Sequence, residues 1–310
     1  MPKNCQTIKI GCRPSKLAIA QTKQVEATIN QHFPSIQTSL HTFKTEGDLN
    51  QHQPLYELGG KNIFIKTLET QLLNKKVDLV VHSLKDITTK LAPSLVLAGI
   101  IKGPSIRDCI ILNQVHRSTI KTLSQLPKTA KIGTSSLRRI AQLKQINPQF
   151  TIIPMRGNID TRIKKLHDQN LDAILLAEAG LIRLDIEDNH YIPLDEKVFI
   201  PAPNQGLLGL EIRETDPHLA QICQSLSDTT QSLFANAQIA LISSLNLNCN
   251  HPFGSYIDDS EEQLFFNYFL SNTTFTHHSK ARIPVTKKSL ATDMDDIQNT
   301  LQKKRNSWPK

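Results

Sequence analysis

Residues 131–177 read KIGTSSLRRIAQLKQINPQFTIIPMRGNIDTRIKKLHDQNLDAILLA, and short β-rich runs in this stretch alternate with segments of helical periodicity. Ile159, Ile163 and Leu166, for example, recur at the spacing that places them on one face of a helix. The pattern predicts strands at 131–133, 151–155 and 173–177, and helices at 135–145 and 159–168. Such alternation is typical of α/β layers built on a mostly parallel sheet.

The same alternation continues on both sides of this stretch. Strands are expected at 8–11, 38–43, 77–81 and 95–101, and helices at 15–32 and 61–74. A new unit begins near Ser105, with a strand at 107–112 and a short helix at 178–184. Two α/β units in tandem predict a cleft between them, which is a common place for small-ligand sites.

The pattern changes after Pro201-Ala202-Pro203. A strand at 206–212 and a helix at 230–245 are expected, then strands at 263–270 and 274–283 and a helix at 291–304. The inward face of the helix at 230–245 is predicted to carry Leu233, Ala237, Ala240 and Leu241. The fold class is therefore α/β, with two α/β domains around a cleft and a smaller C-terminal α+β domain. The expected domains are 1–104 (completed by about 200–225), 105–199 and 226–310.

Composition excludes several classes of protein. The chain has 310 residues, of which 39% are hydrophobic and 21% charged, and no apolar run approaches the roughly 18 residues of a membrane span. The first residues contain no apolar segment of the kind found in signal peptides, so a cytoplasmic location is expected. The five cysteines are odd in number and form no CxxC pair, which argues against a disulfide framework or a metal site.

The basic residues favour a small anionic partner. Lys and Arg total 36 against 28 Asp and Glu, giving a net charge of +8, and only 11 of the 36 are arginine. Arginine binds carboxylates as a two-pronged fork, which lysine cannot do. Aromatic residues are only 5% of the chain, so a nucleic-acid surface is the most distant alternative. Arginines cluster near predicted element ends, at Arg13, Arg107, Arg138, Arg139, Arg156, Arg162 and Arg183.

Three strand-to-helix junctions combine arginine with hydroxyl or amide side chains. They are Arg13-Pro14-Ser15, Gly133-Thr134-Ser135-Ser136-Leu137-Arg138-Arg139, and Arg156-Gly157-Asn158 with Arg162. The first N–H groups and the dipole of each helix favour an anion there. Arg138 and Arg139 would repel each other unless an anion lies between them; the alternative is an N-cap followed by solvated arginines.

Two further segments carry reactive groups. Val81-His82-Ser83-Leu84-Lys85-Asp86 ends a buried strand, and Asp86 could act as a base, a stabiliser of a cation or a simple cap. His82 is interpreted as a hydrogen-bonded core residue. Cys249 is flanked by polar, turn-forming residues, so it is a better nucleophile candidate than Cys109, although an inert surface thiol is the alternative.

These segments together resemble the porphobilinogen deaminase (hydroxymethylbilane synthase) family, in order from Ile8 to about Tyr256. Further matching segments are Gly59-Gly60-Lys61-Asn62-Ile63-Phe64, Ala179-Gly180-Leu181-Ile182-Arg183-Leu184 and Gln205-Gly206. The resemblance implies a three-domain enzyme whose first two domains are similar to periplasmic binding proteins. It also implies a dipyrromethane cofactor held by a thioether bond, and head-to-tail condensation of four porphobilinogen units with release of ammonia to give hydroxymethylbilane, in haem biosynthesis.

The resemblance also assigns roles to residues. Asp86 is the implied catalytic residue, which stabilises the cation left when ammonia departs. Cofactor-binding residues would be Cys249, which carries the thioether, with Ser83, Lys85, Thr134, Ser135, Ser136, Arg138 and Arg139. Substrate-binding residues would be Arg13, Ser15, Gln21, Lys61, Arg156, Arg162, Arg183, Gln205 and Gly206. The expected protein is a monomer that binds porphobilinogen and needs no metal, nucleic acid or membrane.

Some positions depart from the family pattern. Leu247 and Asn248 stand where the family usually has two glycines, Asn204 replaces a usual glycine, and Gln238 and Ile239 replace an acidic-basic pair. The altered cysteine loop keeps two alternatives open. One is a degenerate family member that binds pyrroles without elongating them, and the other is a two-lobed binding protein that holds an anionic ligand without turnover.

Overall fold

The structure is a computed structural model that describes residues 7–45, 48, 62–87, 90–186, 191–248 and 250–308. The chain packs as two compact units. The first joins Met1–Pro104 to Gly206–Leu233, and the second joins Ser105–Gln205 to Phe234–Lys310. No helix in the described part of the chain is long and apolar enough to cross a membrane.

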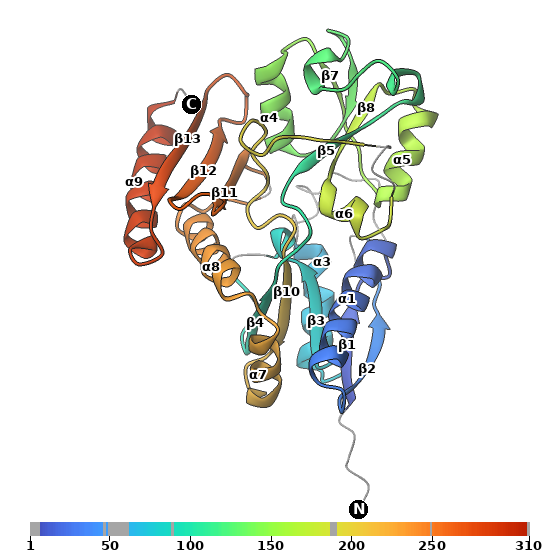
Figure 1. The fold of residues 1–310 in the computed structure, drawn as a ribbon, viewed down its shortest axis with the longest axis vertical. Helices are drawn as coiled ribbons and strands as arrows, with labels where there is room; N and C mark the ends of the chain where they lie inside the picture. Colours follow the sequence, from blue (N-terminus) through green and yellow to red (C-terminus); the bar gives the residue numbers. More distant parts are fainter. Residues whose placement is uncertain are drawn as a thin grey trace, which may run out of the picture. The chain divides into compact units, whose positions relative to one another are not determined.

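The first unit is built on a five-stranded sheet in the order β2-β1-β3-β10-β4 (Figure 1). Its strands are β1 (Thr7–Cys12), β2 (Gln37–Thr42), β3 (Leu79–Ser83), β4 (Leu95–Ile101) and β10 (Leu208–Arg213). The strand β1 pairs in parallel with β2 and β3, whereas β10 runs antiparallel to β3 and β4.

Helices cover both faces of this sheet. The helices α1 (Lys16–His32) and α7 (Pro217–Ser225) bury residues such as Val25 and Leu219 in the same cluster as Ile10 and Leu210. The helix α3 (Asn62–Leu73) packs Leu68 and Leu72 against Val80, on the alternate face of β3.

The second unit contains a five-stranded sheet in the order β7-β6-β8-β5-β9. Its strands are β5 (Asp108–Leu112), β6 (Lys131–Gly133), β7 (Thr151–Ile153), β8 (Ala173–Ala177) and β9 (Ile192–Pro193). The helix α4 (Leu137–Ile146) buries Leu143 on one face, and α5 (Ile159–Asp168) buries Leu166 on the other. The short helix α6 (Glu178–Ile182) follows β8 directly.

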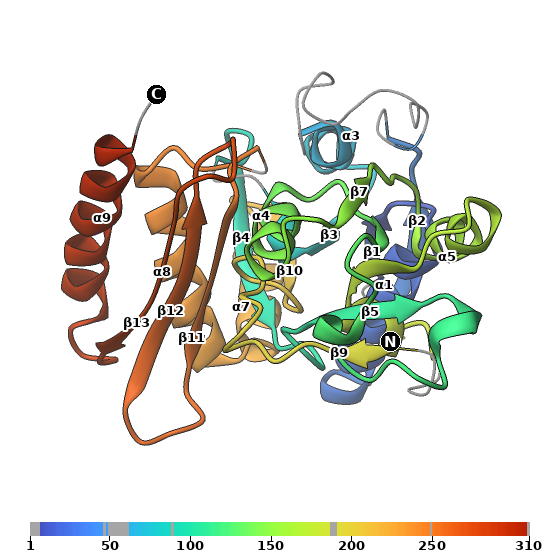
Figure 2. The same cartoon turned by 90° about the horizontal axis from the view of Figure 1, so that it is seen from above.

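The second unit also contains an antiparallel sheet of β11 (Phe253–Asp258), β12 (Leu264–Ser271) and β13 (His278–Val285). The helices α8 (Thr229–Ser244) and α9 (Leu290–Ser307) lie along this sheet, as Figure 2 shows. Phe266 of β12 packs in one core with Leu241 of α8 and Ile297 of α9. Phe269, on the opposite face of β12, packs with Ala141 of α4 and Ile200.

The structure confirms the predicted α/β class with a smaller α+β part and corrects several details. In each five-stranded sheet four strands run in one direction, as predicted, and one strand, β10 in the first sheet and β5 in the second, runs antiparallel to both of its neighbours. The predicted inward face of α8 is wrong at Leu233, which is 40% exposed, and at Ala240, but Leu241 is buried as predicted. The helix also buries Phe234, Ala235 and Gln238. Apolar residues occur all around α8, so its periodicity defines no single face. The helix α7 and the strand β11 were not predicted.

Candidate active site

The junction between β6 and α4 brings two predicted motifs together. Ser135 Oγ donates a hydrogen bond to the carbonyl of Met155 (3.0 Å) and accepts one from its N–H (2.8 Å). The Ser136 N–H donates to Thr134 Oγ1 (3.2 Å). These bonds hold the loop that precedes α4 against the segment that leads to Arg156. Gly133 permits close packing there, because a Cβ would lie 2.6 Å from the Met155 side chain and 2.9 Å from that of Ile174.

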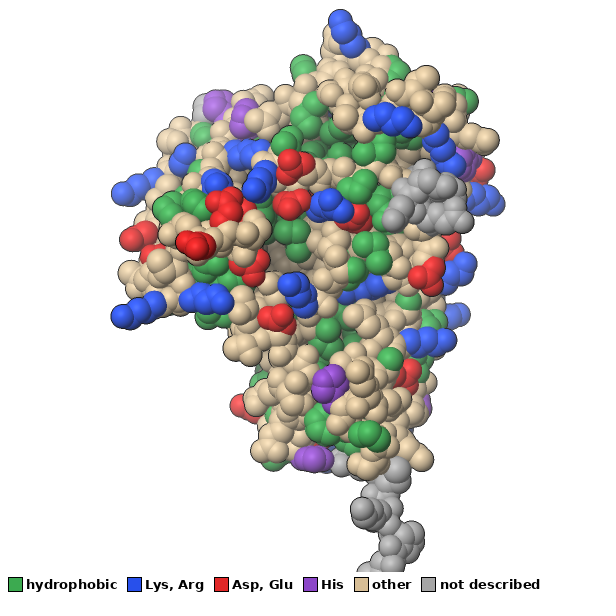
Figure 3. All heavy atoms as spheres, in the orientation of Figure 1, with side chains coloured by type: hydrophobic (Ala, Val, Ile, Leu, Met, Phe, Trp, Pro, Cys, Tyr) green, Lys and Arg blue, Asp and Glu red, His purple; other side chains and the backbone are tan. Residues whose placement is uncertain are grey.

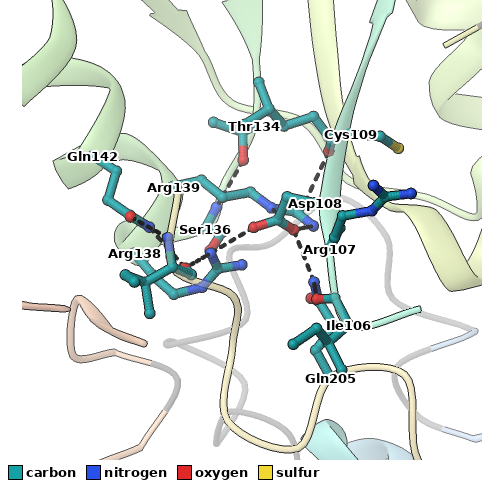
Figure 4. A network of polar contacts seen from close by, with 12 residues as sticks. Ile106, Arg107, Asp108, Cys109, Thr134, Ser136, Arg138, Arg139, Gln142 and Gln205 are labelled. Carbon is teal, nitrogen blue, oxygen red and sulfur yellow. Dashed lines mark hydrogen bonds and ion pairs between the residues drawn. The ribbon is translucent and has the colours of Figure 1, made fainter. Parts of the chain in front are cut away.

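Arg138 and Arg139 share one buried carboxylate, that of Asp108 at the start of β5 (Figure 4). Arg138 Nη1 donates to Asp108 Oδ2 and to the carbonyl of Ile200, both at 2.6 Å. Arg139 donates to Asp108 Oδ1 through Nε (3.1 Å) and Nη2 (2.6 Å), and to the carbonyl of Leu175 (2.8 Å). The anion that the sequence required between these arginines is therefore present within the chain itself.

The electrostatics of this trio follow from its burial. Burial alone would raise the pKa of Asp108, but the two adjacent guanidinium groups hold that pKa well below its usual range. Burial lowers the pKa of Arg138, while the Asp108 carboxylate opposes that shift. A buried ion cluster tolerates removal of one member poorly, since the remaining charges lose their compensation.

Gln205 belongs to the same network. Its side-chain Nε2 donates to the carbonyl of Ile106 (2.8 Å) and to Asp108 Oδ1 (3.1 Å). Gly206 follows with a φ of +91°, a left-handed conformation that favours glycine. Asp108 thus joins three of the predicted site residues, Arg138, Arg139 and Gln205.

The starts of α4 and α5 are rich in hydrogen-bond donors. Their N-cap residues are Ser136 and Asn158, and neither side chain makes a cap hydrogen bond in the described structure. By contrast, Ser15 caps α1 by accepting from the Ala18 N–H (3.2 Å). Helix starts without a side-chain cap leave N–H groups for an anionic ligand.

Three further arginines of the predicted site lie in the second unit, at or beside the ends of α5 and α6. Arg162 Nε donates to the carbonyl of Gly157 (2.8 Å), and Gly157 has a φ of +116° that an L side chain would strain. Arg183 ends α6, and burial lowers its pKa to about 10, so it still carries its charge at neutral pH. Burial also lowers the pKa of Arg156.

In the first unit, β3 ends at Ser83, and the turn that follows it carries Asp86. Ser83 Oγ accepts a hydrogen bond from Gln21 Nε2 of α1 (2.8 Å), which brings two predicted site residues together. Residues Leu84–Asp86 form a 3₁₀ turn, and the Leu84 N–H donates to the carbonyl of Leu207 (2.9 Å). The turn that carries Lys85 and Asp86 is thereby fixed to the start of β10.

His82 is a buried core residue, as the sequence interpretation held. Its Nε2 lies 2.7 Å from Glu211 Oε2 of β10. Arg13 is paired with Asp48, whose Oδ2 also accepts from Thr45 Oγ1 (2.8 Å). Burial opposes ionisation of Asp48, but Arg13 and Thr45 together lower its pKa.

Sequence reasoning missed the partners of the predicted arginines. Asp108, Asp48, Glu211 and Glu178 were not singled out, and Glu178 holds Arg107 through two bonds of 2.8 and 2.9 Å. A carboxylate next to an apolar run, as in Asp108-Cys109-Ile110-Ile111, is the sequence feature that could have identified a buried acidic partner. Cys249 and Lys61 lie outside the described residues.

Two comparisons with known proteins bear on these residues. Residues 8–221 match the family described as porphobilinogen deaminase, dipyromethane cofactor binding domain. The chain is 38% identical over 289 residues to the porphobilinogen deaminase of Limosilactobacillus reuteri (strain DSM 20016), covering 93% of each chain. It is also 38% identical over 260 residues to that of Clostridium novyi (strain NT), covering 83% of this chain and 85% of the relative.

Matches among solved structures include the methionine-binding protein MetQ, at a TM-score of 0.44 and 11% identity over 75% of this chain and 94% of that one. The reduced regulatory domain of OxyR2 from Vibrio vulnificus matches at a TM-score of 0.42 and 14% identity, over 73% and 98%. The sequence matches span the described junctions around Arg13, Arg138 and Arg156 and cover most of the chain. The chain belongs to the porphobilinogen deaminase family.

Proposed function

We propose that this chain performs porphobilinogen deaminase chemistry with Asp86 as its catalytic carboxylate and with arginines of both units as its carboxylate-binding groups. As a member of the family it is a transferase, which condenses four porphobilinogen units head to tail, releases ammonia and forms hydroxymethylbilane for tetrapyrrole biosynthesis. Each porphobilinogen carries an acetate and a propionate group. The growing product therefore needs many cationic partners.

The observation that carries this proposal is the arrangement of donors at the start of α4. Ser136 leaves the helix start without a side-chain cap, and both polar contacts described for Arg138 go through Nη1. The Arg138 and Arg139 guanidinium groups are held rigidly by Asp108, so little conformational entropy is lost when they bind a ligand. This donor set fits the carboxylates of the dipyrromethane cofactor that the family carries.

We infer that Thr134, Ser135, Ser136, Arg138 and Arg139, with Ser83 and Lys85, hold that cofactor, and that Cys249 forms its thioether bond. When bound, the cofactor supplies the pyrrole carbon to which the first substrate unit is joined. The substrate-binding set is the one expected from the sequence: Arg13, Ser15, Gln21, Lys61, Arg156, Arg162, Arg183, Gln205 and Gly206.

The proposed role of Asp86 is electrostatic. Its carboxylate stabilises the positive charge that develops as ammonia leaves the substrate, and such stabilisation by a positioned charge is often the largest single contribution to catalysis. Support comes from the Leu84–Asp86 turn, which is fixed by the bond from the Leu84 N–H to Leu207. A carboxylate on a fixed turn needs little backbone reorganisation during the reaction.

Three other features belong to the proposal. The three sheets support a division into domains 1–104 (completed by about 200–225), 105–199 and 226–310. Acidic and basic side chains are interspersed on the face shown in Figure 3, which supports a small-molecule partner over nucleic acid. We propose that the enzyme works as a cytoplasmic monomer.

Intact-protein mass spectrometry under denaturing conditions tests the function. Freshly purified protein should carry the mass of two deaminated porphobilinogen units, and the Cys249→Ser variant should lack it. The same preparation should convert porphobilinogen to hydroxymethylbilane. A mass increment without turnover would indicate a degenerate enzyme. No increment, even after incubation with porphobilinogen, would indicate a two-lobed binding protein.

A further inference from the structure

Three buried neutral side chains form a continuous hydrogen-bonded chain within the second unit. Ser255 Oγ of β11 donates to Gln238 Oε1 of α8 (2.8 Å), and Gln238 Nε2 donates to Asn204 Oδ1 (3.0 Å). Asn204 Nδ2 reaches the carbonyl of Ala235 (3.5 Å). Asn204, Gln238 and Ser255 are 6%, 4% and 0% exposed, so these contacts form away from water.

The segment that contains Asn204 is also bonded to the arginine network. The carbonyl of Ile200 accepts from Arg138 Nη1 and from Gln142 Nε2 (3.0 Å), and the Ile200 N–H donates to Gln142 Oε1 (2.7 Å). Gln205 reaches Asp108 from the other end of the segment. Residues 200–205 are therefore tied to the side chains that hold Arg138 and Arg139.

The strand β11 lies directly on this segment. The Ser255 N–H donates to the carbonyl of Pro201 (3.1 Å). A Cβ on Gly254 would lie 2.6 Å from that carbonyl oxygen and 2.8 Å from Arg138 Cδ, so glycine permits the close approach. Phe253, the first residue of β11, follows Cys249 by four residues in the sequence.

Asn204 has a φ of +58°, a left-handed conformation that asparagine tolerates better than most residues. Hydrogen bonds between buried amides are directional, and each unmatched partner carries the full cost of desolvation. This series of hydrogen bonds therefore favours one register between α8, β11 and residues 200–205. Asn204 and Gln238 are both departures from the family pattern, and the structure places them in contact.

We propose that Asn204 and Gln238 are positioning residues that hold β11, the strand that follows Cys249 in the sequence, in register with Arg138 and Arg139. This rests on the proposed function, in which Cys249 carries the cofactor and the arginines hold its carboxylates. A group attached at two points is held well only if the distance between those points is set in advance. The amide pair sets it through β11 on one side and residues 200–205 on the other.

The test measures how fast cofactor-free protein acquires its covalent mass when porphobilinogen is added. Asn204→Gly keeps the backbone conformation and removes the side chain, and Gln238→Met keeps the approximate shape. Each variant should load about fivefold more slowly, the change expected for one lost buried hydrogen bond, and the double variant should be no slower than the singles. Ser255→Ala is the milder variant if either of these fails to fold.

Asn113→Ala is the matched control, because Asn113 is another buried amide of the second unit and donates to the Leu171 carbonyl (2.9 Å). It should lower the Tm without slowing loading. The inference would be overturned if the Asn204 and Gln238 variants acquired the covalent mass as fast as Asn113→Ala does. It would also be overturned if the double variant were slower than either single variant by the sum of their effects. A wild-type protein that never gains the mass would instead refute the proposed function.

Discussion

Arg139 donates two hydrogen bonds to a single oxygen of Asp108, through Nε at 3.1 Å and Nη2 at 2.6 Å. The carboxylate is fully buried, and its other oxygen accepts from Arg138. A cofactor carboxylate that binds at α4 would therefore meet guanidinium groups that are already oriented. Asp108 acts here as a structural counter-ion, which allows two adjacent arginines to occupy one helix turn.

Replacement of Asp108 by asparagine should destabilise the second unit strongly. The substitution leaves two buried guanidinium groups without a negative partner, which costs about 3–5 kcal/mol of unfolding free energy. Urea denaturation measures this loss. Glu261→Gln is the control, since Glu261 pairs with Arg282 on the surface (2.6 Å) and its loss should change stability by less than about 1 kcal/mol. Equal effects of the two substitutions would contradict the assigned role.

Arg139→Lys should impair retention of the cofactor. An ammonium group cannot reproduce the three bonds that Arg139 makes to Asp108 and to the Leu175 carbonyl. The fraction of chains that carry the covalent mass should fall about tenfold. The control is Arg282→Lys, at an exposed position on β13 that should leave occupancy unchanged. Unchanged occupancy in Arg139→Lys would refute this prediction.

Asp86→Ala should abolish elongation while the protein stays folded. The residue ends a 3₁₀ turn whose backbone hydrogen bond to Leu207 does not depend on its side chain. Turnover should fall by at least about a hundredfold, as is typical when a stabilising charge is removed from an active site. Circular dichroism and the Tm should match the wild type. Normal tetrapyrrole formation by this variant would remove Asp86 from the mechanism.

Gly254→Ala should disturb the contact between β11 and Arg138. The added Cβ would approach the Pro201 carbonyl oxygen to 2.6 Å, and a backbone atom of this kind cannot move aside without shifting the segment. Overpacking of this type costs about 1–3 kcal/mol. Gly11→Ala is the comparison, because the nearest atom to its Cβ is a Val77 methyl at 3.1 Å. In thermal unfolding, the Tm should fall more for Gly254→Ala than for Gly11→Ala. An equal or smaller decrease for Gly254→Ala would contradict this prediction.

The stability of the protein should fall in acid. Burial raises the pKa of Asp48, but the charge of Arg13 and the hydrogen bonds from Arg13 and Thr45 lower it by more, so its pKa is below the ordinary value. The pKa of Asp108 is also below its ordinary value. A carboxyl whose pKa is lower in the folded state contributes stability above its unfolded pKa, near 4, and loses it as the pH falls. The contribution of these two carboxyl groups to the unfolding free energy should therefore be level above about pH 5 and decrease toward pH 2.

Asp48→Asn tests this assignment. The variant should show a shallower decrease in acid than the wild type, because one of the contributing groups no longer titrates. Asp296→Asn, at an exposed position on α9, controls for the loss of one negative charge. A pH profile of Asp48→Asn that runs parallel to the wild type would show that the Arg13–Asp48 pair does not contribute.

Local sequence determined the elements and the motifs at their ends. Hydrophobic periodicity placed α5 at Ile159–Asp168 and β8 at Ala173–Ala177, and Ser15 occupies the cap position that its type favours. The arginine-bearing junctions were also recognisable, because each combines donor side chains with a strand end and a helix start. These features depend on residues within a few positions of one another.

The tertiary structure decided the partners. Arg138 finds its carboxylate 30 residues earlier in the chain, and His82 finds Glu211 across 129 residues. The direction of β10 in the first sheet and the buried face of α8 were equally beyond local pattern. Charge pairing acts between side chains and strand pairing between backbone groups, and in both cases only the folded chain brings the partners together. The local sequence therefore determines which element each segment forms, but not which residues that element contacts.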